Sequence, residues 1–219
     1  MKRSPRTFAS GMIPSGIACA IALAITACAG TGGTASADAG KPKSPLRRLN
    51  PAPAQAYEIR LQLANVPGPF ESVHATAQYD VQNGGACGKI NAFVGAIPRI
   101  TSNEPFELTK VEEGEYTGTV YLDRIIDEAY YGREVCSWML TEARVALVAN
   151  ADVTSTRYVS GLDAKLIQQQ SAQKRYFWSG YYPRATMDAF RDFGKADLAD
   201  VPADKTAEFF TITLSAKEV

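Results

Sequence analysis

The stretch YEIRLQLANVPGPFESVHATAQYDV, residues 57–81, decides the fold class because apolar and polar side chains alternate through both of its halves. The odd-numbered positions within residues 57–63 and 73–81 are apolar or aromatic: Tyr57, Ile59, Leu61, Leu63, Val73, Ala75, Ala77, Tyr79 and Val81. Polar side chains such as His74 and Asp80 take the other face. A period of two is typical of β-strands with one buried face. The turn residues NVPGPF between the halves predict a β-hairpin with a long loop.

The same pattern continues along the chain. Further strands are predicted in YTGTVYLD (residues 116–123), in residues 135–149 and in FFTITLSA (residues 209–216). The alternation changes phase near Glu142, which predicts a β-bulge or a bend. Helices are predicted only over residues 162–171 and, as a shorter candidate, over MDAFRDF at 187–193. We therefore expect an all-β fold, a single antiparallel β-sandwich-like or open-barrel domain with one or two short helices.

The N-terminus has the features of an export signal. Basic residues at positions 2, 3 and 6 precede an apolar run over residues 11–29. The run contains Pro14 and Gly16 and is rich in alanine, so it suits a permanent membrane span poorly. An ordinary secretory signal cleaved near Ala35 or Ala37 and an uncleaved anchor are the alternatives to the lipoprotein signal described next.

The residues ITAC, Ile25–Cys28, resemble the lipobox of bacterial lipoproteins. This resemblance implies that residues 1–27 are removed and that Cys28 is the lipidation site. Two or more acyl chains hold a protein stably on a membrane. No aspartate follows Cys28. In lipoproteins of Gram-negative type this implies a periplasm-facing protein anchored in the outer membrane.

Residues 28–56 are rich in Gly, Ala, Ser, Thr and Pro and show no hydrophobic period. This composition predicts a disordered, flexible tether, within which Arg47 and Arg48 are expected to be solubilising or to touch lipid headgroups. Residues 57–219 then form one β-rich periplasmic domain. Without residues 1–27 the chain has 20 basic against 23 acidic residues. The chain therefore lacks the excess of basic residues that would favour a nucleic-acid partner, and we expect none.

Two cysteines remain after cleavage and lipidation, Cys87 and Cys136. In an oxidising compartment an isolated pair predicts a disulfide bond. The position of Trp138 after the second cysteine differs from the immunoglobulin order, in which the tryptophan lies between the two cysteines.

The sequence shows no familiar catalytic or phosphate-binding motif, so we expect neither a catalytic residue nor a cofactor. The mature chain has one histidine, His74, which is too few for the usual zinc sites, and we expect no metal site. Asp123, Asp127 and Glu128 gather beside aromatic residues in LDRIIDEAYYG. Paired carboxylates serve glycosidases and calcium sites, but a solvated acidic turn is the favoured interpretation.

The segment KRYFWSGYYPRATMDAFRDFG, residues 174–194, concentrates aromatic residues among arginines. Seven of the 21 aromatic residues of the chain fall between Tyr176 and Phe193. Tyr, Trp and Arg are enriched in binding hot spots, whereas core packing is the alternative role. The candidate binding residues are Arg175, Tyr176, Trp178, Tyr181 and Tyr182.

Several motifs together resemble a group of uncharacterised proteobacterial lipoproteins. They are YEIRLQL, VPGPFESV, YTGTVYLD, YYGREVCSW, YFWSGYYPR, FRDFG and FFTITLSA. The resemblance implies no site residues, but some such small lipoproteins are associated with immunity against antibacterial effectors. Three hypotheses follow: an inhibitor or immunity protein that binds a protein partner in the periplasm, an accessory envelope lipoprotein that binds peptidoglycan or an assembly partner, and a cryptic carboxylate-based hydrolase.

Overall fold

The computed structural model describes residues 45–91, 93 and 95–219. The predicted signal peptide, the lipidation site Cys28 and the first part of the predicted tether lie outside these residues. Among the helices of the described part, none is long and apolar enough to cross a membrane.

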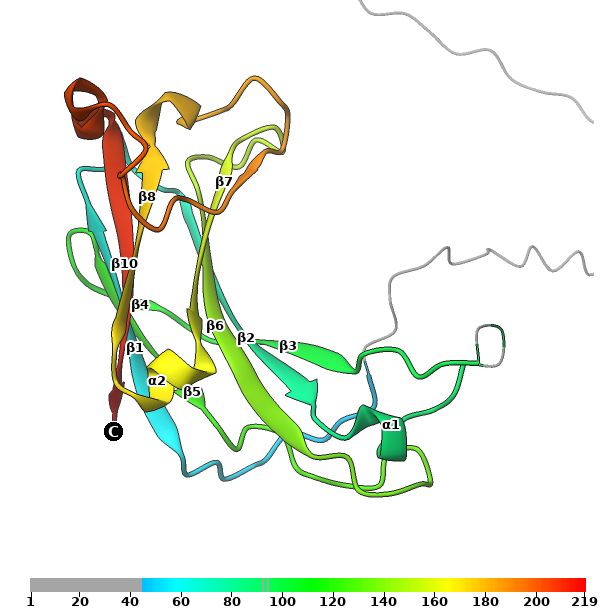
Figure 1. Ribbon diagram of the computed structural model, residues 1–219. Helices are drawn as coiled ribbons and strands as arrows, with labels where there is room; N and C mark the ends of the chain where they lie inside the picture. Colours follow the sequence, from blue (N-terminus) through cyan, green and yellow to red (C-terminus); the bar gives the residue numbers. More distant parts are fainter. Residues whose placement is uncertain (1–44, 92, 94) are drawn as a thin grey trace, which may run out of the picture. The chain divides into compact units, whose positions relative to one another are not determined.

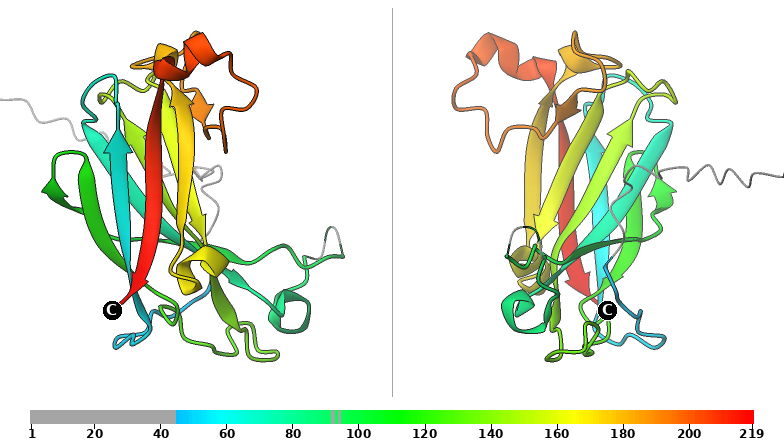
Figure 2. Two further views of the ribbon diagram at one scale, coloured as in Figure 1. Left: turned by 60° about the vertical axis from the view of Figure 1, so that its left-hand side comes forward. Right: turned by 90° about the vertical axis from the view of Figure 1, so that its right-hand side faces the viewer.

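The described chain is an all-β sandwich of two five-stranded sheets, as predicted (Figure 1). The first sheet contains, in spatial order, β4 (Thr109–Glu112), β5 (Glu115–Tyr121), β1 (Ala56–Ala64), β10 (Phe209–Glu218) and β8 (Ala172–Trp178). The second contains β3 (Thr101–Pro105), β2 (Ser72–Val81), β6 (Trp138–Val148), β7 (Arg157–Asp163) and β9 (Arg191–Asp192). Neighbouring strands are antiparallel except for the parallel pair β7–β9. Figure 2 shows the sheets from two further sides.

The predicted hairpin of residues 57–81 is wrong in its pairing, although both strands are present. β1 pairs with β5 and β10, whereas β2 pairs with β3 and β6 in the other sheet. The loop between them contains Pro67 and Pro69, which have no N–H for a hairpin ladder. Because each strand has only one apolar face, both can face the same core from opposite sheets.

The core lies between the sheets and includes many of the predicted inward positions. Ile59, Leu61, Phe210, Ile212 and Leu214 are completely buried. The predicted irregularity near Glu142 is confirmed as a register shift, in which Gln78 pairs with Glu142 while Tyr79 pairs with Leu140. The extra residue on β6 carries the strand past the bulge, and inward burial resumes at Ala143.

The helices are shorter than the sequence pattern predicts. Residues up to Asp163 belong to β7, and only Ala164–Gln168 form α2, which lies at the lower end of the sandwich in Figure 1. Residues 187–193 do not form the second predicted helix, because Arg191–Asp192 are strand β9. The remaining helical turns are α1 (Gly84–Cys87), η1 (Ser179–Tyr181) and η2 (Ala203–Glu208).

The disulfide between Cys87 and Cys136 is present, as predicted. Both residues are completely buried, and the bond joins α1 to the segment that leads into β6. It therefore fixes the irregular connection between β2 and β3 onto the sandwich.

The tether prediction requires a correction at its end, because residues 45–55 lie against the domain. Arg47 forms an ion pair with the buried Glu104, and Arg48 pairs with Glu128 at 3.1 Å. Leu49 forms a β-bridge with Ile125. Polar and proline-rich composition predicted a free linker, but side chains distant in sequence bind this segment, so neither arginine is a free solubilising group.

Two buried tyrosines give a first prediction about stability. The Tyr79 hydroxyl donates a hydrogen bond to the Tyr121 carbonyl oxygen at 2.6 Å, whereas the Tyr158 hydroxyl has no partner among the described residues. We expect Tyr79→Phe to lower the free energy of unfolding by about 1 kcal/mol, and Tyr158→Phe to leave it unchanged or raise it by up to about 1 kcal/mol. Denaturant unfolding of both variants checks this; an equal loss in both would contradict it.

Candidate functional site

The five predicted binding residues do not share one surface. β8 is an edge strand, and its register partners on β10 place Arg175 on the inner side with Phe177, which is completely buried. Tyr176 and Trp178 alternate onto the outer side. Tyr182 packs edge-on against Phe70 and donates a hydrogen bond to the Pro69 carbonyl oxygen at 2.6 Å. Phe177 and Tyr182 therefore serve packing.

Trp178 and Tyr181 form an aromatic cluster on the surface together with Phe190. The ring centroids of Trp178 and Tyr181 lie 4.9 Å apart, and those of Tyr181 and Phe190 lie 5.0 Å apart, both in edge-to-face geometry. The indole N–H of Trp178 donates to Glu208 at 3.0 Å, and the residue remains 38% exposed. A binding role for this cluster stays a prediction.

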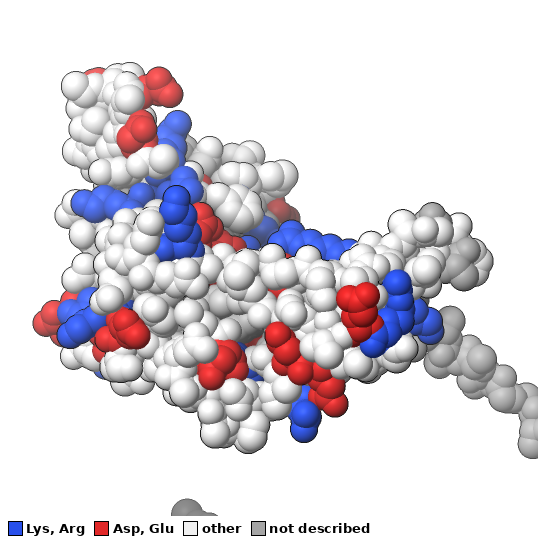
Figure 3. All heavy atoms as spheres, turned by 60° about the horizontal axis from the view of Figure 1, so that its bottom comes forward, with Lys and Arg blue, Asp and Glu red and all other residues white. Residues whose placement is uncertain are grey.

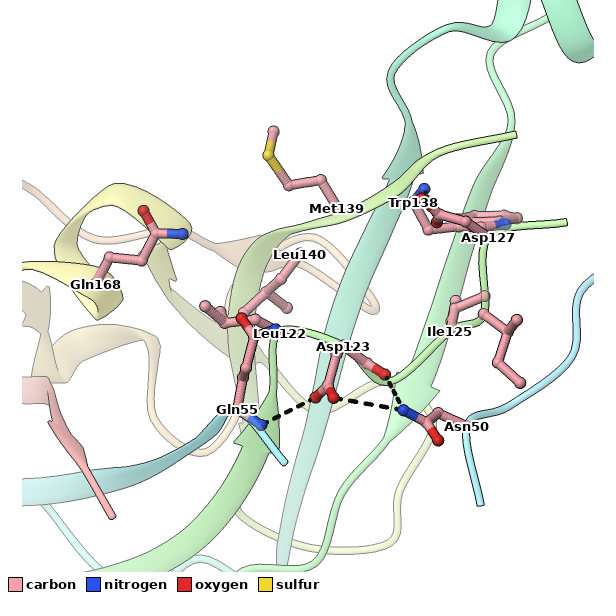
Figure 4. A pocket seen from close by; sticks show the side chains of 11 residues that line it. Asn50, Gln55, Leu122, Asp123, Ile125, Asp127, Trp138, Met139, Leu140 and Gln168 are labelled. Atoms are coloured by element: carbon pink, nitrogen blue, oxygen red, sulfur yellow. Dashed lines mark hydrogen bonds between the residues drawn. The ribbon is translucent and has the colours of Figure 1, made fainter. Parts of the chain in front are cut away.

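The acidic turn lines a hollow of about 480 Å³ at one end of the sandwich (Figure 4). Asp123 accepts hydrogen bonds from the backbone N–H groups of Ala54 and Gln55, at 2.9 and 3.1 Å. Asp127 accepts one from the backbone N–H of Trp138 at 2.8 Å. With Glu128 paired to Arg48, all three carboxylates bind donors of the chain itself. These contacts indicate that the three carboxylates have a structural role.

Charges of both signs lie interspersed at the end of the domain that faces the reader in Figure 3. This end therefore offers no extended surface of a single sign.

The outer side of the second sheet carries a different surface, which we name the outer-face groove. It consists of two adjoining hollows of about 530 and 280 Å³ that share His74, Arg157 and Arg191 as lining residues. Arg144 and the ring of Phe193, which is 59% exposed, line the larger hollow. Basic and aromatic side chains therefore border two adjoining hollows.

The strands determine which side chains enter the groove. On β2, His74 alternates with the buried Ala75, so it points outward, as the sequence pattern predicted. On β7, Arg157 alternates with the buried Tyr158. Asp192 lies between Arg191 and Phe193 but does not line the groove. Burial raises the pKa of its carboxyl group, against a hydrogen bond from the backbone N–H of Gly194.

Gly194 allows the segment that follows β9 to approach β8. Its φ is +64°, and an added Cβ would lie 2.8 Å from the Phe177 ring. Lys195 then exchanges two backbone hydrogen bonds with Tyr176, at 3.0 and 2.8 Å. The segment that carries Arg191 and Phe193 is therefore held between β7 of the second sheet and β8 of the first.

Positive charge dominates the groove. Arg157 and Arg191 are register partners across β7 and β9, and neither forms an ion pair with any residue that the structure describes. Arg144 pairs with Glu142. Asp152 lines the smaller hollow, where it accepts hydrogen bonds from the backbone N–H and hydroxyl of Thr154, both at 2.8 Å. Like charges on neighbouring strands are unfavourable, so an anion bound between them would be stabilised.

The floor of the groove is apolar. Ala146, Val148 and Val159 line it from the outer face of β6 and β7, where an antiparallel sandwich usually places polar side chains. This is the signal that the sequence contained: residues 145–149 are apolar on both faces of the strand. The inward positions of this run predict only the buried face of the strand, whereas its outward apolar positions, Ala146 and Val148, are the ones that line the groove.

Within the described residues no group of three or more His, Cys, Asp or Glu side chains is arranged to hold a metal ion. No family model, curated protein or solved structure matches the chain.

Proposed function

We propose that this protein is an outer-membrane lipoprotein whose periplasmic domain binds a protein partner without catalysing a reaction. In its most specific form the proposal makes the domain an immunity protein that inhibits an antibacterial effector acting in the periplasm. The lipobox at Ile25–Cys28 supports the location. The outer-face groove is the observation that supports the binding function.

Three properties of the groove favour binding over catalysis. It combines two arginines that have no ion-pair partner among the described residues with an exposed phenylalanine, and aromatic residues and arginine are enriched at protein interfaces. Its apolar floor would bury hydrophobic surface of a partner. Among the described residues that line it, Asp152 is the one carboxylate; it is hydrogen-bonded to Thr154 and borders only the smaller hollow.

A capture experiment tests the proposal. We expect the tagged full chain, solubilised from membranes, to retain a specific partner that Arg157→Glu/Arg191→Glu does not retain. Each reversed charge should cost about 2 kcal/mol of binding free energy, or about 30-fold in affinity, because it replaces attraction by repulsion. The partner is identified by mass spectrometry, and its affinity is then measured with the purified pair.

The matched control is Lys165→Glu/Lys174→Glu, which changes the net charge equally at exposed sites away from the groove. The variant Trp178→Ala tests whether the surface aromatic cluster also contributes to retention of the partner. Equal retention by the groove variant and the control would contradict the role of the groove. If the partner is a lipase, amidase or muramidase whose activity falls on binding, the immunity function follows.

A further inference from the structure

We propose that the outer-face groove recognises an acidic segment of its protein partner that also carries an apolar side chain. This inference rests on the proposed function and adds the chemistry of the bound surface. The carboxylates would bind Arg157 and Arg191, and the apolar side chain would pack between Val159 and Phe193.

Charge complementarity selects an acidic occupant. His74, Arg157 and Arg191 border both hollows, so a chain that lies across the place where the hollows meet would contact all three side chains. Arg157 and Arg191 project from adjacent strands, which lie about 4.8 Å apart. A guanidinium group can bind one carboxylate through two parallel hydrogen bonds. We therefore expect each of the two arginines to bind one carboxylate of the partner.

The apolar lining selects a polypeptide over a polyanionic polysaccharide. Val159 is 7% exposed although it lies on the outer face, and Phe193 is 59% exposed beside it. A leucine or similar side chain placed there would remove the Phe193 ring from water. A polysaccharide of uronic acids has carboxylates but no aliphatic side chain to place in this position.

The stretch of this chain that precedes the described residues is a poor candidate for the occupant of the groove. Residues 29–44, AGTGGTASADAGKPKS, contain one aspartate against two lysines and no large apolar side chain. The groove is therefore expected to be filled by another molecule.

Designed peptides test the inference on the purified full chain. The probes are fluorescent peptides that alternate glutamate with leucine, glutamine with leucine, or glutamate with serine, and binding is followed by fluorescence anisotropy. We expect the glutamate–leucine peptide to bind at least tenfold more tightly than either other peptide, and its affinity to fall as salt is raised. Arg157→Gln/Arg191→Gln should remove the preference for glutamate, whereas Lys165→Gln/Lys174→Gln should preserve it.

Phe193→Ala separates the apolar contribution. It should weaken the glutamate–leucine peptide at least fivefold and leave the glutamate–serine peptide unchanged, because only leucine is expected to contact the ring. Equal binding of polygalacturonate, muropeptides and the glutamate–leucine peptide, with no effect of Phe193→Ala, would overturn the inference and indicate a general anion site. If no peptide is preferred while Arg157→Glu/Arg191→Glu still abolishes capture of the partner, this chemistry is wrong and the proposed function stands.

Discussion

Replacing both cysteines, in Cys87→Ala/Cys136→Ala, is expected to lower the free energy of unfolding by about 4 kcal/mol. The bond closes a loop with a sequence separation of 49 residues, and opening that loop increases the conformational entropy of the unfolded chain. Denaturant unfolding of the full chain with and without the substitutions measures the difference. The loss should be large because typical domains have only about 5–15 kcal/mol of total stability.

Reduction of the unmodified protein provides the control for the cysteine variant. Reduced wild type and the double-alanine variant should unfold at similar denaturant concentrations, since both lack the cross-link. Hydrogen exchange should also increase first in the connection between β2 and β3, which α1 anchors through Cys87. Unchanged stability in both samples would show that the covalent bond contributes nothing beyond packing.

Arg47→Ala should cost about 3 kcal/mol, because it leaves the carboxylate of Glu104 buried without its cation. Glu104 is 5% exposed and also accepts a hydrogen bond from the Ser102 hydroxyl. The neighbouring Arg48→Ala is the matched control. Its pair with Glu128 is exposed at both ends, so its loss should cost less than about 1 kcal/mol. Denaturant unfolding compares the two variants, and equal effects would refute a special role for the buried pair.

The buried pair also predicts a pH dependence. Burial alone would raise the pKa of Glu104, but hydrogen bonds from Arg47 and Ser102 outweigh it and hold the pKa below the ordinary value. The folded state therefore binds a proton less readily than the unfolded chain. The stabilisation that the ionised Glu104 gives to the folded state is complete above the ordinary glutamate pKa of about 4.3. It is lost as the pH falls through the lowered pKa. In the Arg47→Ala variant, the free energy of unfolding should therefore fall less on acidification than it does in the wild type.

The alternation of residues 57–81 and 209–216 predicted which side chains are buried, but not which strands are neighbours. A period of two reports the face of a strand, and β1 and β2 satisfy it equally well in one sheet or in two. The helix expected at 187–193 failed for a related reason. Its aromatic residues serve tertiary contacts, such as that of Phe190 with Tyr181, so their spacing carries no helical signal.

The site was harder to predict than the fold because its parts come from distant strands. His74, Arg157 and Arg191 meet only through the pairing of β2, β6, β7 and β9. The aromatic segment contributes Arg191 and Phe193 to the lining of the groove, whereas the five residues singled out from the sequence do not line it. Residues 45–55 show the same limit, because a composition typical of linkers conceals an ion pair across 57 positions.

The position of β10 inside the first sheet, between β1 and β8, has a consequence for how the protein folds. β10 pairs with β1 on one side and β8 on the other, so Tyr57 lies opposite Glu218. A nascent chain that has not yet produced residue 209 lacks the strand that joins β1 to β8, so β1 exposes an unpaired edge. Such distant pairings fold slowly. The first sheet can therefore be completed only after residues 209–218 have been synthesised, and the earlier strands must wait for β10 before the sandwich closes.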